Sequence, residues 1–445
     1  MSTLGNILGT QSGLETESVN PVRIPATVHN IQTQSICPRA DSIIRKLQQA
    51  GFEAYLVGGC VRDLLLGYTP KDFDIATSAQ PEQVRKLFSS ARLIGRRFRL
   101  AHIYFGRDYI EVATFRAPHA DNQRGGRVNE QGRIIHDNVY GTIKEDVWRR
   151  DFTINALFYD PATGEVIDYV GGIQDLRDKR IRLIGEPEQR YREDPVRMLR
   201  ALRFAAKLDT LPEGQTRDLI GELGYLLEDV APARLFDELL KMLHSGRGWK
   251  TLQLLEEYDL LQCLLPLTHE SLAEDPEGTF RPLIQVALQN TDRRIAEGKT
   301  VMPAFLFAVL LWEQMTHLAA QFREEGHPEV QSLQLAAADI LREQVNTTAI
   351  PRRFSNITRE IWALQPRFRH RDLRRANILI NNPRFRAAYD FLCLRAAAGE
   401  NVKDDCEWWN KFIEASPEEK QAMCKPPHKK RRKKRSKAKS SENAS

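Results

Sequence analysis

The feature that most constrains the fold is a glycine pair, Gly58-Gly59, between two segments of different periodicity. Residues 53–57 form a short apolar run typical of a buried strand, and residues 61–66 have the spacing of a helix that stops at Gly67. The pattern predicts a strand, a glycine turn and a helix. Such a turn lets backbone N–H groups approach a phosphate, which Arg62 can also reach. An ordinary tight turn has the same pattern.

A pair of carboxylates follows the predicted helix. Asp72 and Asp74 stand at i and i+2 in a second strand candidate, residues 72–76, so their side chains should project from one face. Two carboxylates on one face suit divalent cations such as Mg²⁺. Exposed acidic pairs and calcium loops look alike, so the motif is weak alone. Combined with a phosphate-binding turn upstream, it favours metal-dependent chemistry on a phosphate.

The first third of the chain alternates helical and strand patterns. The expected elements are helices over residues 38–51 and 81–88, and strands over residues 102–105 and 109–115 that pair around a tight turn. We therefore expect a mixed α/β domain over residues 37–180. Residues 1–36, which show no sustained period, are expected to form a flexible leader.

From about Tyr191 the sequence changes to long helical periods with few strand signals. The expected helices cover residues 195–208, 235–243, 249–258, 305–320 and 330–341, with loops at residues 270–281 and 321–328. The C-terminal part should therefore be mostly α. We divide it into a helical region, residues 181–268, an arginine-rich helical region, residues 269–415, and a basic tail, residues 416–445.

The basic excess of the chain lies in that tail. The net charge is +6, but residues 425–439 hold ten Lys and Arg and no acid, which leaves residues 1–424 with a net charge of −3. A block of like charges repels itself and buries little apolar surface, so we expect it to be disordered and attracted to polyanions, nucleic acid first. A merely solvating tail or a patch for anionic lipid would have the same composition.

Several classes of protein are excluded. The longest apolar run, residues 301–312, falls short of the roughly 20 residues that a membrane span needs. Residues 1–35 lack a secretory signal, so a cytoplasmic location is expected. The six cysteines, Cys37, Cys60, Cys263, Cys393, Cys406 and Cys424, contain no CxxC pair and are expected to be reduced thiols. The histidines His102, His119 and His136 lack the spacing of metal ligands.

Longer motifs resemble a known family. Residues 56–67, LVGGCVRDLLLG, followed by DFD at residues 72–74, resemble the signature of the tRNA nucleotidyltransferase and bacterial poly(A) polymerase family, class II of the polymerase-β-like superfamily. The resemblance continues through RRDFTINA at residues 149–156 and EDPVRMLRALRF at residues 193–204, and covers roughly residues 50 to 265. It implies an α/β polymerase-β-like nucleotidyltransferase domain followed by a mostly α-helical C-terminal region.

The resemblance also implies a reaction. The 3′-hydroxyl of an RNA attacks the α-phosphate of a nucleoside triphosphate, and pyrophosphate leaves. Asp72 and Asp74 would hold two Mg²⁺ ions. Asp151 is the further carboxylate that matches the family motif, and Glu111 on the strand 109–115 is a geometric competitor for that place. We favour Asp151 at this stage.

Other matched residues imply nucleotide binding. Gly58, Gly59 and Arg62 would meet the triphosphate, Arg150 a phosphate and Asn155 the ribose, although an Arg–Asp pair is also a common structural bridge.

Asp194 and Arg197, three apart on a predicted helix, would share one face and select the incoming nucleotide without a template. Arg200 and Arg203 continue this stripe towards phosphate or RNA. Surface ion pairs have the same spacing.

Two further segments favour the poly(A) polymerase branch. LIGRRFRLAHI at residues 93–103 resembles the segment that marks this branch, and its Arg96, Arg97 and Arg99 are expected to line the approach to the active site; a basic edge strand is the alternative. Residues 352–386 interleave arginines with Phe354, Trp362, Phe368 and Phe385, as expected for a surface that tracks single-stranded RNA. Solvated faces of amphipathic helices would look similar.

The sequence thus predicts an enzyme that adds adenylates to RNA 3′ ends without a template, using ATP and Mg²⁺ and promoting RNA turnover. RNA and ATP are its expected partners, RNA-turnover proteins are possible ones, and a monomer is favoured. CCA addition to tRNA is the alternative reaction. A catalytically inactive RNA-binding protein is the alternative from another class.

Overall fold

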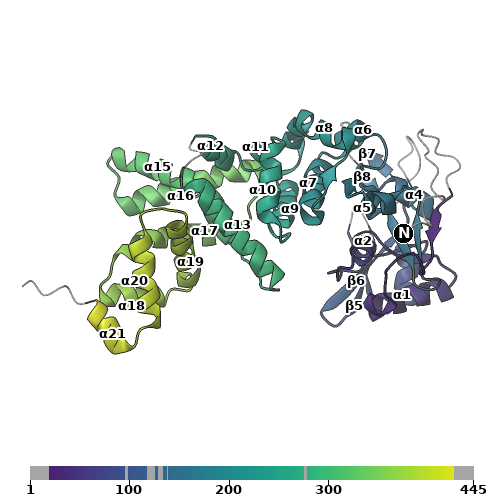
Figure 1. The fold of residues 1–445 in the computed structure, drawn as a ribbon, viewed down its shortest axis with the longest axis horizontal. Coiled ribbons are helices and arrows are strands. Elements are labelled where there is room, and N and C mark those ends of the chain that lie inside the picture. Colours follow the sequence, from purple (N-terminus) through teal and green to yellow (C-terminus); the bar gives the residue numbers. More distant parts are fainter. Residues whose placement is uncertain are drawn as a thin grey trace, which may run out of the picture. The chain divides into compact units, whose positions relative to one another are not determined.

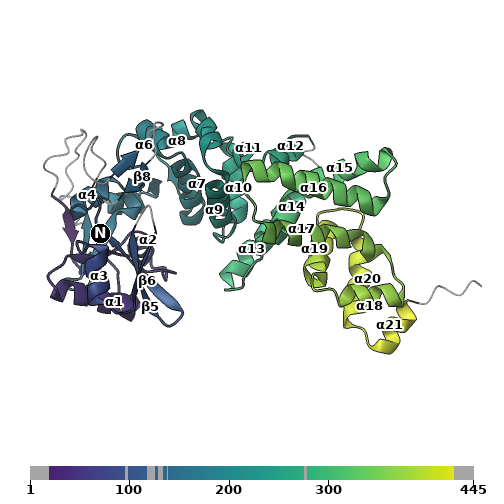
Figure 2. The same ribbon diagram turned by 180° about the vertical axis from the view of Figure 1, so that it is seen from behind.

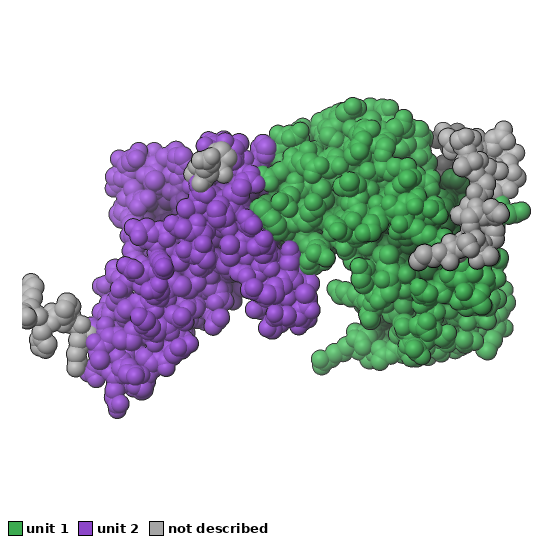
Figure 3. Space-filling view, in the orientation of Figure 1, with its two compact units in different colours: residues 1–264 green, residues 265–445 purple. Residues whose placement is uncertain are grey.

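The structure is a computed structural model and describes residues 20–95, 99–117, 126–128, 134–137, 139–274 and 278–424 of the 445. In residues 126–128 and 134–137 it describes the backbone alone. The chain divides into two compact units, residues 1–264 and residues 265–445, shown in green and purple in Figure 3. The first holds all the described strands, and the described part of the second is helical.

Eight described strands of the first unit form one sheet in the order β1-β10-β9-β2-β3-β6-β5-β4 (Figure 1). They are β1 (Val22–Ile24), β2 (Ala54–Val57), β3 (Ile75–Thr77), β4 (Ala91–Ile94), β5 (Leu100–Phe105), β6 (Asp108–Thr114), β9 (Leu157–Asp160) and β10 (Glu165–Asp168). β3 and β6 are parallel, and the other neighbours are antiparallel. Two small sheets pair β7 (Gly126–Val128) with β8 (Ile134–Asp137) and β11 (Arg180–Ile181) with β12 (Leu211–Pro212).

Helices make up most of the remainder. Those of the first unit are α1 (Pro38–Gln49), α2 (Gly59–Leu65), α3 (Pro81–Leu87), α4 (Ile143–Trp148), α5 (Gly172–Arg177), α6 (Pro187–Glu193), α7 (Val196–Leu208), α8 (Gly214–Glu222), α9 (Pro232–Leu243), α10 (Gly248–Glu257) and α11 (Leu261–Leu264). Those of the second are α12 (Pro266–Glu274), α13 (Phe280–Ala296), α14 (Pro303–Leu310), α15 (Trp312–Glu324), α16 (Glu329–Thr347), α17 (Arg352–Leu364), α18 (Leu373–Ile380), α19 (Phe385–Ala397), α20 (Lys403–Glu414) and α21 (Pro417–Met423). The expected fold class, an α/β domain followed by a mostly helical part, is confirmed.

The two faces of the large sheet are covered differently. On one face Leu56, Ile75 and Val112 pack against α1, α2 and α3. Figure 2 shows α1 and α3 together. On the other face Val57 and Ala76 belong to a second core that includes residues of α4. No described residue of β4, β5 or β6 belongs to this second core, so their outer face is left open beside it.

Residues 20–36 differ from the flexible leader that we expected. Val22–Ile24 form β1, which pairs antiparallel with β10, and Ile31 and Ile36 are buried against the first core. The segment gains its backbone hydrogen bonds only from a strand far along the chain, so local periodicity does not reveal it.

Some expected boundaries in the helical part are wrong. The single helix expected over residues 305–320 is two helices, α14 and α15, separated at Leu311. The loops expected at residues 270–281 and 321–328 are shorter, because α12 continues to Glu274, α13 begins at Phe280 and α15 continues to Glu324. Helix ends depend on tertiary packing more than on local propensity, which explains these differences.

Two of the six cysteines are joined where α19 packs against α20. Cys393 and Cys406 form a disulfide, with Cα atoms 5.3 Å apart, so they are not the reduced thiols that we expected. Their spacing of 13 residues gives no signal, because the contact arises only when two neighbouring helices pack. Next to this pair, Trp409 is fully buried and its indole N–H donates to the carbonyl oxygen of Phe368. In the described part of the chain, no helix is long and apolar enough to cross a membrane.

Candidate active site

The glycine turn forms as expected between β2 and α2. Gly58 has φ +76°, a conformation that side chains rarely adopt, and caps the N-terminus of α2. A Cβ atom at Gly58 would lie 3.4 Å from the carbonyl oxygen of Asn155 and 3.6 Å from Nη1 of Arg150. The backbone conformation therefore requires glycine, whereas a Cβ atom would meet the 150–155 segment at ordinary van der Waals distance. Gly58 and Gly59 line a pocket of about 320 Å³.

The carboxylates of the DFD motif line a second, larger pocket. Asp72 and Asp74 come just before β3, which begins at Ile75, and not within the strand as expected. Both line a pocket of about 570 Å³ together with Glu111 of β6. Ile75 is paired with Val112, so the preceding residues, Asp74 and Glu111, lie at the same level on neighbouring parallel strands. Asp74 and Glu111 also line the glycine-turn pocket, so the two pockets adjoin at these carboxylates.

The carboxylates of this cluster repel one another. Loss of hydration within the fold, followed by the charges of Glu111 and Asp72, raises the pKa of Asp74 to about 6, although Asp74 keeps access to the open pocket. Carboxylates that repel one another in this way are held together at a cost that a cation would remove. Within the described residues, no group of three or more His, Cys, Asp or Glu side chains is arranged to hold a metal ion.

The donor set nevertheless fits Mg²⁺. This ion is commonly bound through one or two carboxylates, with waters and substrate phosphates completing the octahedron. Asp72 and Asp74 supply the carboxylate oxygens and the pocket beside them supplies room for a triphosphate.

Asp151 is engaged in a different way. Its Oδ1 accepts hydrogen bonds from the backbone N–H of Phe152 at 2.8 Å and from Nδ2 of Asn155 at 3.2 Å. Its Oδ2 accepts two from the Arg200 guanidinium, at 2.7 and 2.5 Å. Burial raises the pKa of Asp151, but the charge and hydrogen bonds of Arg200 outweigh it and bring the pKa down to about 2. Asp151 lines the glycine-turn pocket and is already saturated by protein donors.

The other side chains near the turn that we expected to bind the nucleotide form hydrogen bonds or ion pairs with neighbouring residues. Arg62 is 3% exposed; its Nη1 donates to Oδ1 of Asn155 at 2.7 Å, and its Nε and Nη2 donate to Asp63. Arg150 pairs with Asp146 at 2.8 Å. All three predicted residues, Arg62, Arg150 and Asn155, still line the glycine-turn pocket.

Three arginines of α2 and α7 lie close to one aromatic ring. The guanidinium carbons of Arg62, Arg200 and Arg203 lie 5.2, 5.4 and 4.5 Å from the centre of the Phe204 ring. Arg203 also donates to the buried Glu238 at 2.6 Å. Arg200 and Arg203, which we expected to face RNA, are thus occupied by ion pairs inside the fold.

We expected Asp194 and Arg197 to lie on one helix, but they do not. Asp194 ends α6 in an extended conformation and pairs with Arg234 at 2.6 Å, whereas Arg197 lies in the first turn of α7. Pro195 separates the two helices, because proline cannot continue the first one. Arg197 donates to Glu193 and to the carbonyl oxygen of Arg190. Neither Asp194 nor Arg197 lines the two pockets above.

Of the basic residues near β4, Arg96 and Arg97 lie outside the described residues. Arg99 pairs with Glu82 at 2.5 Å. The basic residues 425–439 of the tail also lie outside the described part of the chain.

The arginine-rich segment is not an interleaved aromatic surface. Trp362, Phe368 and Phe385 are at most 7% exposed and belong to the protein core. Arg371 and Arg384, which precede α18 and α19, form ion pairs with Asp405 and Glu360. The alternative interpretation, amphipathic helices with basic faces, describes these aromatics better.

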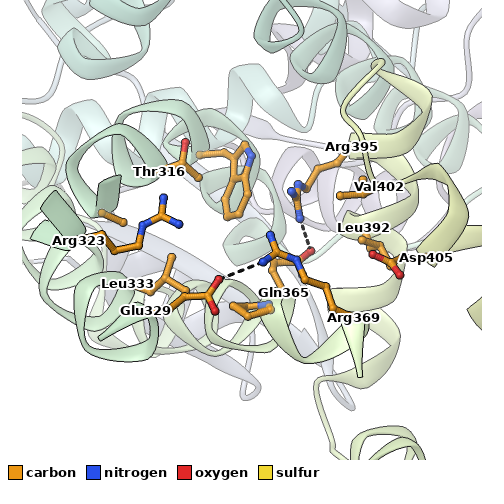
Figure 4. Close-up of a pocket in the computed structure, with 13 residues that line it drawn as sticks. Thr316, Arg323, Glu329, Leu333, Gln365, Arg369, Leu392, Arg395, Val402 and Asp405 are labelled. Carbon is orange, nitrogen blue, oxygen red and sulfur yellow. Dashed lines mark hydrogen bonds and ion pairs between the residues drawn. The ribbon is translucent and has the colours of Figure 1, made fainter. Parts of the chain in front are cut away.

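A pocket of about 110 Å³ lies in the second unit (Figure 4). Its arginines are largely paired: Arg369 with Glu329, and Arg395 with Glu400, with a hydrogen bond from Arg395 to Oε1 of Gln365. These contacts stabilise the helices that line the pocket.

Sequence reasoning missed several supporting residues. Asp63 accepts from both Arg62 and Lys207, and Asp146 accepts from Arg150. Arg190 donates to the carbonyl oxygens of residues 149 and 150, which ties α6 to the site. Two of these pairs have a local signal, Asp63 next to Arg62 and Asp146 four residues before Arg150, whereas the contacts of Lys207 and Arg190 are long-range.

Comparison with known proteins agrees with this geometry. Residues 54–182 match the family model described as "Poly A polymerase head domain", residues 212–272 match "Probable RNA and SrmB- binding site of polymerase A", and residues 325–442 match "Polymerase A arginine-rich C-terminus". The family resemblance seen in the sequence is thereby confirmed.

Individual relatives distinguish the two branches. Poly(A) polymerase I from Salmonella typhimurium is 47% identical over 406 residues, 90% of this chain and 87% of the relative. A CCA-adding enzyme from Enterococcus faecalis is 41% identical over 206 residues, which are 46% of this chain and 48% of the relative. The crystal structure of the Bacillus stearothermophilus CCA-adding enzyme in complex with CTP is similar with a TM-score of 0.55 and 25% identity, over 85% of this chain and 83% of that one. The chain therefore belongs to the poly(A) polymerase family of nucleotidyltransferases.

Proposed function

We propose that this chain transfers AMP from ATP to the 3′-hydroxyl of RNA, without a template and with release of pyrophosphate. The observation that carries the proposal is that two pockets, one lined by the glycine turn and the other by Asp72, share the lining residues Asp74 and Glu111. A triphosphate and an attacking hydroxyl can thus meet beside the same carboxylates. The likeness to Poly(A) polymerase I extends over nearly the whole chain, which supports RNA as the acceptor.

The carboxylates orient the reacting groups. Asp72 and Asp74 would hold Mg²⁺, which when bound lowers the pKa of the attacking hydroxyl and neutralises the charge of the leaving pyrophosphate. Gly58 and Gly59 leave the backbone of the turn open, so the triphosphate can approach it closely. No nucleophile from the protein is needed.

We assign the third carboxylate of the site to Glu111 instead of Asp151, which the motif favoured. Glu111 lies beside Asp74 and its charge contributes to the raised pKa of Asp74. Asp151 accepts four hydrogen bonds from protein donors, two of them from Arg200. Its role is to fix the 150–155 segment against α7.

Arg62, Arg150 and Asn155 remain our candidates for contacts to the nucleotide. Each lines the glycine-turn pocket and each is held by another residue, so the donors are positioned before the nucleotide arrives. Arg197 and Asp194 are the candidates for base selection. Arg197 is connected to the pocket through Arg190, which donates to the carbonyl oxygen of Arg150. The basic tail and the arginine faces of the second unit would hold the RNA backbone without reading its sequence.

The proposal is tested with purified protein and Mg²⁺, with each nucleoside triphosphate separately and with CTP and ATP together, on an unstructured RNA and on a tRNA that lacks its CCA end. We expect a long ladder on the plain RNA with ATP alone. Addition that stops after CCA, and only on the tRNA, would assign the reaction of the CCA-adding relatives instead.

The Asp74→Asn variant tests the site in the same assay. AMP transfer should fall by about 10³-fold or more, because the variant loses a charged ligand, while RNA binding in EDTA stays at the wild-type level. Asp178→Asn, at a carboxylate that follows α5 and lines neither pocket, serves as the matched control. Transfer by Asp74→Asn within tenfold of the wild type refutes the site.

A further inference from the structure

The open face of β4, β5 and β6 carries an unusual set of side chains. Side chains alternate along these strands, and Ala101, Ile103 and Val112 are buried on the core side. The register pairs Arg92 with His102, His102 with Glu111, and Tyr104 with Tyr109 on the other side. Figure 1 shows β5 and β6 side by side; β4 pairs with β5 and ends the sheet. This face is continuous with the catalytic carboxylates, because Glu111 belongs to both.

The rings on this face are stacked. His102 lies on Tyr109 with ring centroids 4.1 Å apart and an interplanar angle of 6°. Tyr104 contacts Tyr109 at 5.6 Å, and the Arg92 guanidinium lies 5.0 Å from the centre of the Tyr104 ring. Tyr109 is nevertheless 52% exposed. The stack is therefore assembled on one side and open to solvent on the other.

The stack lies at a defined distance from the reacting groups. Tyr109 precedes Glu111 by two residues on the same face of β6, which is about 7 Å along a strand. That length matches roughly two nucleotides at the about 3.4 Å rise of a nucleic-acid strand. Tyr109 and Glu111 also line the same pocket as Asp72 and Asp74.

Cations border the stack. Lys71 and Arg107 line this pocket, and within the described residues neither has an ion-pair partner. Arg39, on the same rim, pairs with Asp108. Lys71 and Arg107 can therefore each meet a phosphate of a single strand whose bases lie on the open aromatic faces, while the carboxylates of the same pocket face the metal side.

We propose that His102, Tyr104 and Tyr109 form the stacking platform for the last bases of the RNA, just upstream of the nucleotide whose 3′-hydroxyl reacts. The inference deepens the proposed function and rests on RNA being the acceptor. Every base has an aromatic face, so such a platform accepts any sequence. It therefore suits an enzyme that extends RNA without a template.

The test uses the full-length protein and a short RNA with 2-aminopurine at the penultimate position, in EDTA and without ATP. Stacking on the platform should quench the fluorescence of the wild-type complex. Tyr109→Ala should abolish most of the quenching and weaken RNA binding about tenfold, whereas Tyr109→Phe should retain both. Tyr68→Ala, at a tyrosine with 57% exposure that lines neither pocket, is the matched control and should behave as the wild type.

Turnover provides a second readout. Tyr109→Ala should raise KM for RNA about tenfold and leave KM for ATP unchanged. Tyr104→Ala is the second variant and should show the same split if Tyr109→Ala does not fold.

The proposal is overturned if these alanine variants bind and quench as the wild type does, or if Tyr109→Phe is as defective as Tyr109→Ala. Quenching without any AMP transfer by the wild type would leave the platform standing and count against the proposed function alone.

Discussion

Arg200 of α7 donates two hydrogen bonds to a single carboxylate oxygen of Asp151, at 2.7 and 2.5 Å, across 49 residues of sequence. The contact joins the motif that begins at Arg149 to the helix that follows Pro195. Both residues were expected to act on ligands, one on metal and the other on RNA. Instead they form an ion pair with each other, and both line the glycine-turn pocket.

Replacing Asp151 by Asn should lower stability in a pH-dependent way. The pKa of Asp151 is about 2, below the ordinary 3.8, so the ionised carboxylate stabilises the fold fully above about pH 4. This pH-dependent part is about 2 kcal/mol and is lost as the pH falls through 2. Urea unfolding of the wild type and Asp151→Asn should differ by about 1 kcal/mol less at pH 3 than at pH 7.

A double variant is the control for this bridge. Asp151→Asn leaves the Arg200 guanidinium without its partner, so the combination with Arg200→Met should recover part of the lost stability. Equal differences at both pH values would contradict the assignment of the low pKa to Asp151.

Glu111→Gln should impair metal binding, because it removes a charge from the cluster around Asp74. We expect AMP transfer to fall about 100-fold or more, and Mn²⁺ affinity measured by titration calorimetry to fall at least about tenfold. Asp151→Asn should keep the Mn²⁺ affinity. The opposite pattern, with Asp151→Asn losing Mn²⁺ and Glu111→Gln keeping it, returns the role of third carboxylate to Asp151.

Arg197→Lys should relax the choice of nucleotide. The substitution keeps the charge but loses the planar fork that can address a base edge. The preference for ATP over CTP, measured as a ratio of kcat/KM values, should fall about tenfold. Arg192→Lys on α6, where Arg192 pairs with Glu188 at the surface, is the matched control. An unaltered ratio in Arg197→Lys moves selectivity to other residues.

The cysteine pair makes a chemical prediction. Of six cysteines, four should react with a thiol reagent in denaturant before reduction and six after it, because Cys393 and Cys406 are joined. In the oxidised protein Cys406→Ser should cost about 3 kcal/mol of stability, as expected for a closed loop of this length. Six reactive thiols before reduction would show that the pair is open.

Local sequence patterns predicted much of the architecture. The glycine turn, the helix after it and the β5–β6 hairpin all form where periodicity placed them, with Gly58 and Gly106 at positive φ. These elements depend on the residues within a few positions of one another, so their signal is in the sequence. The strand β1 was missed because its partner β10 is supplied by residues 165–168.

The sequence by itself also determined the family, through motifs that contain Asp72, Asp74 and Asp151. Only the tertiary structure decided which carboxylates of the pocket stay open to a ligand and which are bound by protein donors. Parallel pairing of β3 with β6 brings Glu111 beside Asp74, whereas the approach of α7 gives Asp151 to Arg200. A carboxylate can bind either a cation or an arginine. Packing between elements that are distant along the chain decides which of the two it contacts.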